Sequence, residues 1–396
     1  MADTQTSTSW LCWNGKSGNH FVDIPLKPPL KLRWKKKLKL PTIAIAHADR
    51  VVVRCDGSIE ALNLQTGECV WRVQEYGKKS YEFVLPAGDA EAVYFHARTE
   101  FRAVRWDNGE TIWSHKRKRL TIIDPDDPIV AGPYLLLRKD VLDKRTGTTI
   151  RNDPKGHNDG FAVGNRFVRY RFDPHRLECL DISSGKLLWC DEYAKQPIIA
   201  VNDPGPGHHI SYSLEAAWEG YTLARGGPYD NSWWYLQDMA SGRILSQTPS
   251  HLLPEPWNIS EDWDLGATDG RELYLFWARD ERGASPGRGS GTDYFSRPQA
   301  FALPDFKYLW EGELLFHQDS HVGSPYQGLL TRDYFYYVWR NARDKNPKTY
   351  LTALNRTDGT VAFQCTVGPW AESILAVDDA LIIIGRGGTV FCYGEK

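Results

Sequence analysis

The chain has 396 residues and a mass of 45.1 kDa, with 48 Lys and Arg against 50 Asp and Glu, so the formal net charge is −2. A charge this close to zero gives no bulk attraction to nucleic acid or to an anionic membrane. Trp (16) and Tyr (19) are abundant whereas Met is rare (2), and this composition favours strands over helices.

The chain starts with MADTQTSTSWLCWNGKSGNH, which lacks the basic and then apolar stretches of a signal peptide, and no later run is apolar enough to span a bilayer. The seven cysteines are an odd set with no Cys-x-x-Cys, so we expect reduced, structural thiols. We therefore expect a cytoplasmic protein that neither enters a membrane nor binds nucleic acid.

One pattern recurs along the chain: an apolar first residue, a turn glycine six positions later and an aromatic residue four positions after the glycine. The copies in chain order are ALNLQTGECVW (61–71), AVRWDNGETIW (103–113), VLDKRTGTTIR (141–151), CLDISSGKLLW (179–189), LQDMASGRILS (236–246), ALPDFKYLW (302–310) and ALNRTDGTVAF (353–363). The third and fifth copies end in Arg151 and Ser246, and the sixth lacks two residues and the glycine. Each copy predicts a strand, a tight turn and a second strand whose last residue packs on the neighbouring unit.

Two further strand-like runs precede each copy, for example 42–49 and 50–55, so each unit is expected to have four antiparallel strands, as a propeller blade does. Three strands follow the seventh copy and then the chain ends. The missing fourth strand is predicted in LKLRWKKKLKL (30–40), because pairing the two ends of the chain leaves no open sheet edge. The sequence thus predicts an all-β fold: a propeller of eight four-stranded antiparallel blades over residues 30–396, with residues 1–29 as an N-terminal arm.

The first, second and fourth copies resemble the A-x-(D/N)-x-x-(T/S)-G-x-x-x-W signature of PQQ-like (quinoprotein-type) propeller repeats. The resemblance covers roughly residues 30–396 and implies the fold. It does not carry over the quinone, because quinoprotein dehydrogenases of this type resemble longer secreted chains with a vicinal cysteine pair, and this chain has none. The lipobox of the outer-membrane assembly lipoproteins is also absent. We expect no cofactor, PQQ included.

The spacing of the repeat changes after Trp189. Up to that residue the aromatic positions are about 40 residues apart, the length of one blade, and afterwards the gaps are longer. The additions fall in predicted loops at 193–209, 248–262, 280–298, 313–322 and 341–348, in blades 5 to 7. In a four-stranded blade, these loops leave the same face of the ring. Because loops on a rigid scaffold commonly carry function, the predicted site is the rim of this face.

Two kinds of chemistry gather in these loops. A histidine oriented by a carboxylate could act as a general acid or base, and the candidates are His209, His251, His317, Asp319 and His321. Arginines with aromatic residues could hold an anionic or aromatic ligand, and those candidates are Arg282, Arg288, Tyr294, Trp257, Trp339 and Arg340. The histidine spacing by itself does not predict a metal site.

Two functions follow from this reading. The first is a non-catalytic binding propeller that uses the rim of blades 5 to 7 to hold a small-molecule ligand or a protein partner. The second is a cofactor-independent enzyme, a lyase, cyclase or hydrolase of specialised metabolism, with a histidine as general acid or base at the mouth of the channel. Propellers serve both purposes, so the fold does not decide between them.

Overall fold

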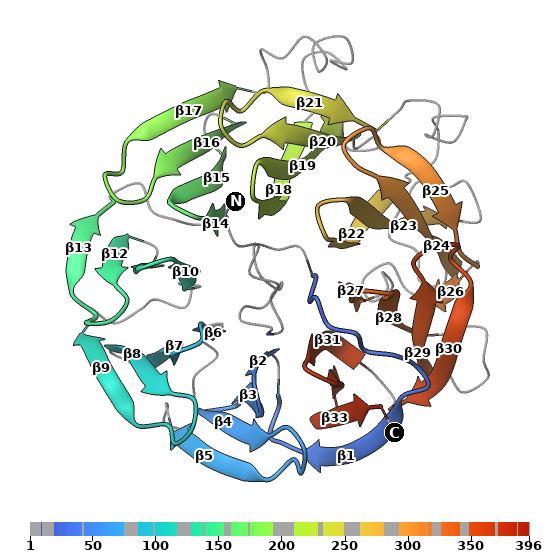
Figure 1. Cartoon of the computed structure of the whole chain (residues 1–396), viewed down its shortest axis with the longest axis horizontal. Coiled ribbons are helices and arrows are strands. Elements are labelled where there is room, and N and C mark those ends of the chain that lie inside the picture. Colours follow the sequence, from blue (N-terminus) through green and yellow to red (C-terminus); the bar gives the residue numbers. More distant parts are fainter. Residues whose placement is uncertain are drawn as a thin grey trace.

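Eight antiparallel sheets, each with four main strands and one of them with a further short strand, follow one another around a ring in the computed structural model (Figure 1). The structure describes residue 9 and residues 20–395, apart from residues 42, 75–85, 98–99, 117–127, 138, 154–159, 173–174, 193–209, 229–232, 249–261, 281–292, 314, 319–325, 341–347, 369–370 and 386. No helix in these ranges is long and apolar enough to cross a membrane. The prediction of an all-β, eight-bladed propeller is confirmed.

The blades are numbered from the first complete sheet, and the strands of each run from the channel outward. Blades 1 to 4 are β2 (Ile43–His47), β3 (Arg50–Cys55), β4 (Ser58–Asn63), β5 (Cys69–Gln74); β6 (Ala87–Gly88), β7 (Ala92–Ala97), β8 (Glu100–Arg105), β9 (Thr111–Lys116); β10 (Ile129–Ala131), β11 (Tyr134–Leu136), β12 (Asp140–Asp143), β13 (Thr149–Asn152); and β14 (Gly160–Val163), β15 (Arg166–Phe172), β16 (His175–Asp181), β17 (Leu187–Glu192).

Blades 5 to 8 complete the ring, and the longest strands lie in blades 5 and 6. They are β18 (Ile210–Trp218), β19 (Tyr221–Pro228), β20 (Trp233–Asp238), β21 (Ile244–Gln247); β22 (Asp262–Thr268), β23 (Glu272–Asp280), β24 (Asp293–Ala302), β25 (Lys307–Glu311), with β26 (Leu315–Gln318); β27 (Tyr326–Leu330), β28 (Tyr334–Arg340), β29 (Thr349–Asn355), β30 (Val361–Val367); and β31 (Ala371–Val377), β32 (Ala380–Gly385), β33 (Thr389–Gly394), with β1 (Lys31–Lys37).

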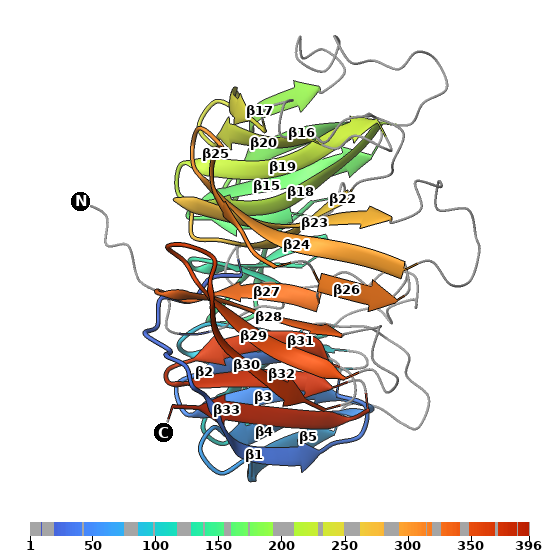
Figure 2. The same cartoon turned by 90° about the vertical axis from the view of Figure 1, so that its right-hand side faces the viewer.

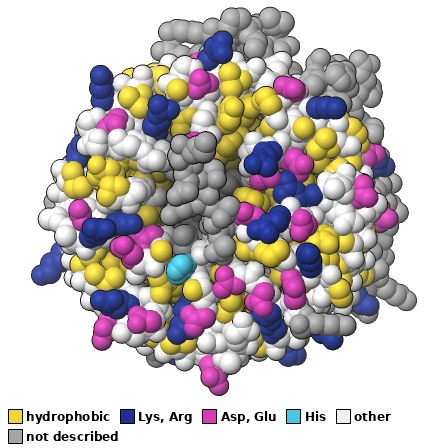
Figure 3. Space-filling view, in the orientation of Figure 1, with side chains coloured by type: hydrophobic (Ala, Val, Ile, Leu, Met, Phe, Trp, Pro, Cys, Tyr) yellow, Lys and Arg dark blue, Asp and Glu magenta, His cyan; other side chains and the backbone are white. Residues whose placement is uncertain are grey.

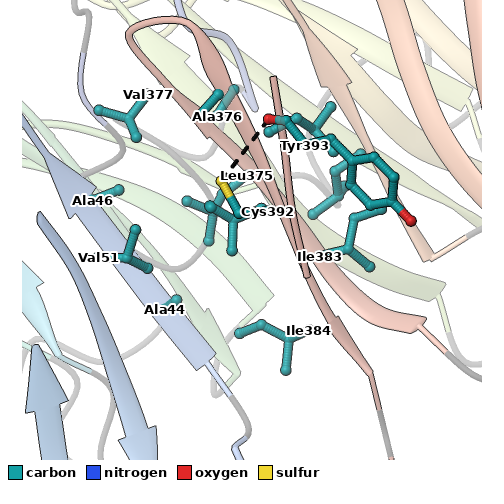
Figure 4. Close-up of a cluster of buried hydrophobic side chains, with 14 of the residues drawn as sticks. Ala44, Ala46, Val51, Leu375, Ala376, Val377, Ile383, Ile384, Cys392 and Tyr393 are labelled. Atoms are coloured by element: carbon teal, nitrogen blue, oxygen red, sulfur yellow. Dashed lines mark hydrogen bonds between the residues drawn. The ribbon is translucent and has the colours of Figure 1, made fainter. Parts of the chain in front are cut away.

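Blade 8 closes the ring with strands from both ends of the chain, as the sequence predicted. The N-terminal β1 pairs antiparallel with β33 and places Trp34 opposite Cys392. Behind this pairing, apolar side chains of blades 8 and 1 form one buried cluster that includes Val51, Leu375 and Ile383 (Figure 4). Because β1 fills the outer position of the last sheet, the ring closes through a sheet rather than a loop.

Neighbouring blades are joined by the aromatic residue of the repeat. The indole Nε1 of Trp34 donates to the carbonyl of Leu64 in the next blade, at 2.8 Å, and its ring covers the turn glycine of that blade. The same bond recurs from Trp71, Trp113, Trp189 and Trp310. Arg151 takes the place of Trp in blade 3, with Nη2 donating to Ile182 O at 2.9 Å. The third copy, although it lacks the aromatic residue, therefore still makes the hydrogen bond that connects one blade to the next.

The sixth copy was misread in the sequence. Ala300, rather than Ala302, lies opposite Trp310, just as Ala61 lies opposite Trp71. No residues have been lost, and the glycine position is taken by Phe306, with φ at 51° and its side chain fully buried. The prediction of a shortened copy was wrong, because a glycine was expected at the turn.

The N-terminal segment from residue 20 lies against the ring. His20 O accepts from Leu330 N and Val22 N donates to Leu330 O, so the segment adds a short parallel pairing to the innermost strand of blade 7. Val22 and Leu26 are fully buried in the core of blades 7, 8 and 1, and Tyr336 Oη donates to Leu26 O.

Candidate ligand-binding site

The additions after Trp189 lengthen the strands of blades 5 and 6 at one face of the ring. Strands β18, β19, β23 and β24 have 9, 8, 9 and 10 residues, whereas β10 and β11 have 3 each. In every blade the first and third strands begin at this face and the second and fourth end there, so the strand ends that flank the added segments share it (Figure 2). We call it the long-strand face.

Blade 6 reaches farthest on the long-strand face. Its strand β24 pairs with β25 over residues 299–302 and with β26 over residues 293–296. Between the two, Gly312 N donates to Pro298 O, so β25 and β26 are two parts of one interrupted outer strand. The register sets Tyr294 directly opposite His317. Both residues were predicted in loops and lie in strands instead. The reason is that the antiparallel pair β23–β24 extends beyond the neighbouring blades at the long-strand face, as far as the pairing of Asp280 with Tyr294.

The wall between blades 6 and 7 is built of aromatic side chains. Leu315 of β26 is buried in one cluster with Phe335 and Tyr337 of β28, and Trp339 of the same strand packs against this cluster. Trp339 is partly exposed and stacks on Tyr350 of β29, with the ring centroids 5.1 Å apart and the planes at 26°. The end of β28 and the start of β29 thus present an aromatic pair at the long-strand face.

A hydroxyl group fixes this pair from below. Trp339 Nε1 donates to Thr352 Oγ1 at 3.0 Å, and Gln364 Nε2 donates to the same oxygen at 3.2 Å. Burial raises the pKa of the Tyr337 phenol; a hydrogen bond from Thr352 opposes that rise, and the negative charge of Glu313 adds a smaller increase. Tyr337 is therefore neutral. The indole of Trp339, in turn, is held by a directed hydrogen bond to Thr352 as well as by packing.

The predicted site residues differ in what the structure describes of them. Trp339 and Arg340 close β28 at the long-strand face, and both are partly exposed. For Tyr294 and His317 the backbone pairing brings together two segments predicted to converge. The others lie outside the described residues: His209, His251, Asp319, His321, Arg282, Arg288 and Trp257.

The sequence analysis missed three residues of this wall, namely Tyr337, Tyr350 and Thr352. All three lie in regular strands of the repeat, which were treated as scaffold. Alternation along YFYYVWR was the available signal, since it places Tyr337 and Trp339 on one face of β28. Within the described ranges no three His, Cys, Asp or Glu side chains gather as metal ligands.

Comparisons with known proteins agree with this fold. A family model described as outer membrane protein assembly factor BamB matches residues 29–123. BamB from Moraxella catarrhalis is similar in structure, with a TM-score of 0.53 and 13% identity over 92% of this chain and 100% of that one. Quinohemoprotein alcohol dehydrogenase ADHIIG from Pseudomonas putida HK5 gives a TM-score of 0.56 and 11% identity over 98% of this chain and 80% of that one.

The WD40 domain of SCAP from fission yeast gives a TM-score of 0.50 and 7% identity, over 94% of this chain and 97% of that one. No curated protein matches the sequence. Identities this low bear on the fold alone. The repeat, the family-model match over residues 29–123 and the eight-bladed ring together support a β-propeller fold of the PQQ-like type.

Proposed function

We propose that the protein is a binding propeller that holds its ligand on the long-strand face, at the wall between blades 6 and 7. The observation that carries this proposal is the partly exposed Trp339, stacked on Tyr350 and tied to Thr352. An aromatic surface that is already fixed loses little side-chain entropy when a ligand stacks on it. Arg340 follows Trp339 directly and so faces the other side of β28, but it ends the strand at the same face of the ring, where its guanidinium group suits an anion at the strand end. The favoured ligand is a small molecule with a planar apolar part and an acidic group.

The predicted loop residues complete this proposal. We expect Arg282, Arg288 and Trp257 to extend the same rim and Tyr294 to border it from blade 6, because the segments that carry them leave the long-strand face. A protein partner at the rim is the alternative occupant, but a cation and an anchored aromatic pair at one strand end favour the small ligand.

We further propose that PQQ is not the ligand. PQQ is a tricarboxylate, and a site for it on the channel wall needs cationic side chains. The innermost strands β2, β6, β10, β14, β18, β22, β27 and β31 contain no Lys or Arg. The channel wall that these strands form therefore does not fit the cofactor.

A direct test begins with the protein as purified. Native mass spectrometry would detect a co-purified ligand, and metal analysis would accompany it. We then expect the planar aromatic sulfonate 1-anilinonaphthalene-8-sulfonate, used as a probe, to bind Trp339→Ala at least tenfold more weakly than the parent protein. Trp218→Ala is the matched control, because Trp218 also lies beside a tyrosine but ends β18 at the opposite face. Equal loss of binding in both variants would contradict the proposal.

The enzyme remains a second proposal, and the register that sets Tyr294 opposite His317 favours it. A histidine and a phenol at adjacent positions can transfer protons, and His209, His251, Asp319 and His321 would belong to the same site. The test is to incubate a metabolite extract with the parent protein and with His317→Ala and to compare both by mass spectrometry. A compound consumed only by the parent protein supports catalysis. If nothing is consumed by either, or both consume it equally, the enzyme proposal fails.

A further inference from the structure

A serine and a histidine are hydrogen-bonded at the opposite mouth of the channel. His47 is the last residue of β2, the innermost strand of blade 1, and β2 ends at the face opposite the long-strand face. Ser9 Oγ lies 2.8 Å from His47 Nδ1, and Ser9 is 8% exposed. A hydroxyl within hydrogen-bond reach of an imidazole nitrogen is the basic geometry of an activated serine nucleophile.

The imidazole packs on a residue of blade 2 and lies in the electrostatic field of a carboxyl of blade 8. Its ring packs on Trp106 of blade 2 with centroids 5.5 Å apart and planes at 47°, and Trp106 is itself fixed because its Nε1 donates to Asp89 O at 2.8 Å. On the other side, Asp378 begins the first turn of blade 8. Burial and then the negative charge of Asp379 raise the pKa of the Asp378 carboxyl, and a smaller opposing effect comes from His47, so the carboxyl and the imidazole interact electrostatically. Asp49 and Asp379 lie near the same carboxyl.

We propose that Ser9 and His47 form a nucleophile and general base for acyl transfer from small esters at this mouth of the channel. The oxygen of Ser9 forms a bond to the ester carbonyl carbon while its proton passes to His47 Nδ1. The bond from that carbon to the alcohol oxygen then breaks, and the alcohol leaves with the proton from His47. Water next attacks the acyl group on Ser9, His47 takes a proton from the water, and Ser9 regains a proton as the acid is released.

Four features of the molecule support this assignment. The pair spans segments far apart in the sequence, which a local turn would not require. The base, His47, packs on the ring of Trp106, so little conformational entropy is lost when the imidazole takes up the position required for proton transfer. The carboxylate of Asp378 stabilises the imidazolium that forms when the serine proton is transferred. The surface around this mouth shows both signs of charge interspersed (Figure 3), which suits an uncharged ester better than a highly charged one.

The site is independent of the ligand site proposed above, because the two lie on opposite faces and share no residue. Their tests therefore fail separately. Trp339→Ala should leave the reaction of Ser9 unchanged, and substitutions of Ser9 or His47 should leave probe binding at the wall of blades 6 and 7 unchanged.

The experiment uses the full chain, a fluorophosphonate probe and p-nitrophenyl acetate. We expect the fluorophosphonate to label the peptide that contains Ser9, and we expect Ser9→Ala to abolish both labelling and ester hydrolysis above background. His47→Ala should slow both at least tenfold, and added imidazole should restore part of the rate, which a purely structural role for His47 would not allow. Labelling elsewhere in the chain, or an unchanged rate in Ser9→Ala, overturns the proposal.

If the parent protein reacts with neither probe, a second variant still tests whether His47 acts as a base on the side chain at position 9. In Ser9→Cys, a base at 2.8 Å should generate thiolate at neutral pH. We expect iodoacetamide to modify Cys at position 9 at least fivefold faster than in the Ser9→Cys, His47→Ala double variant, measured peptide by peptide by mass spectrometry. Equal rates would show that His47 does not act on this position and would overturn the proposal.

Discussion

At the scale of single residues, the turn glycine and the aromatic of the repeat form one device. Gly67 has φ at 71°, and a Cβ atom there would lie 2.7 Å from Cδ2 of Trp34. Glycine is required at position 67 for two reasons: the positive φ is unfavourable for other residues, and the indole of Trp34 occupies the space that a Cβ atom would need. The sequence signal was strong because neither requirement tolerates another residue without a change in its partner.

Substitution of Gly67 can separate the two requirements. We expect Gly67→Ala to lower the free energy of unfolding by about 2–4 kcal/mol, from left-handed backbone strain and overpacking against Trp34. Gly132 is the matched control, since its φ is 57° but a Cβ there would meet no atom within 4 Å. Gly132→Ala should cost only about 1–2 kcal/mol. Chemical denaturation measures both, and equal losses would show that the indole does not limit this position.

At the scale of elements, the joint between blades 5 and 6 exchanges the large and the small residue of the repeat. Where Trp34, Trp71, Trp113, Trp189 and Trp310 each cover a turn glycine of the next blade, the joint between blades 5 and 6 has Ser246 at the Trp position and Phe306 at the glycine position. Ser246 Oγ still donates to a backbone carbonyl, that of Pro304, and Phe306 is buried with Leu236 and Phe301. The aromatic ring here belongs to Phe306 of blade 6, whereas at the other joints it belongs to the tryptophan of the preceding blade. The sequence analysis found this copy but set its frame wrongly, because the large residue stands at the glycine position and the small residue at the aromatic position.

A double-mutant cycle tests this exchange. Phe306→Gly should cost about 3–5 kcal/mol because it empties a buried site, and Ser246→Trp should cost about 1–3 kcal/mol because it overpacks the same site. In the double variant the indole would cover a glycine, as Trp34 covers Gly67. We therefore expect a loss at least 2 kcal/mol smaller than the sum of the single losses. Additive losses, measured by equilibrium denaturation, would mean that the two side chains do not share one space.

The candidate site was predictable at the level of segments and less so at the level of side chains. The longer spacing after Trp189 indicated where the ring is enlarged, at the long-strand face of blades 5 and 6, because added length must leave a closed ring at strand ends. That a ligand binds there stays a prediction. The position of Tyr294 in β24 and of His317 in β26 was not predicted, because their segments read as polar loops. Thr352 was missed for the opposite reason, since a regular strand gave no sign that its hydroxyl anchors Trp339.

At the scale of the whole molecule, the ring and its closure followed from the sequence because each unit repeats and because an open blade leaves unpaired backbone groups. The course of the N-terminal segment did not follow, since it has no repeat to align. The structure brings His20 between blades 6 and 7, where its Nδ1 lies 3.0 Å from Gly266 O and its side chain is almost fully buried. This contact links the segment to the stability of the ring.

Because of its burial, His20 has a pKa lowered from 6.5 to about 4, against smaller opposing effects of hydrogen bonds to Gly266 and Gly328. Between these two values the unfolded chain binds more protons at this position than the folded chain, so stability falls as the pH is lowered from about 6.5 to about 4 and then levels off. The loss from this residue should reach about 3 kcal/mol. Above pH 6.5 the residue contributes no pH dependence, because it is neutral in both states.

His20→Asn removes this titration while keeping a side-chain donor for Gly266 O, and asparagine tolerates the left-handed φ of 52° found at this position. We expect the variant to be somewhat less stable than the parent protein at pH 7.5 and to lose less stability on acidification, so that the two curves of unfolding free energy against pH converge toward pH 4.5. Denaturation at half-unit steps measures this convergence. Parallel curves across the whole range would show that His20 is not the group that couples the N-terminal segment to protonation.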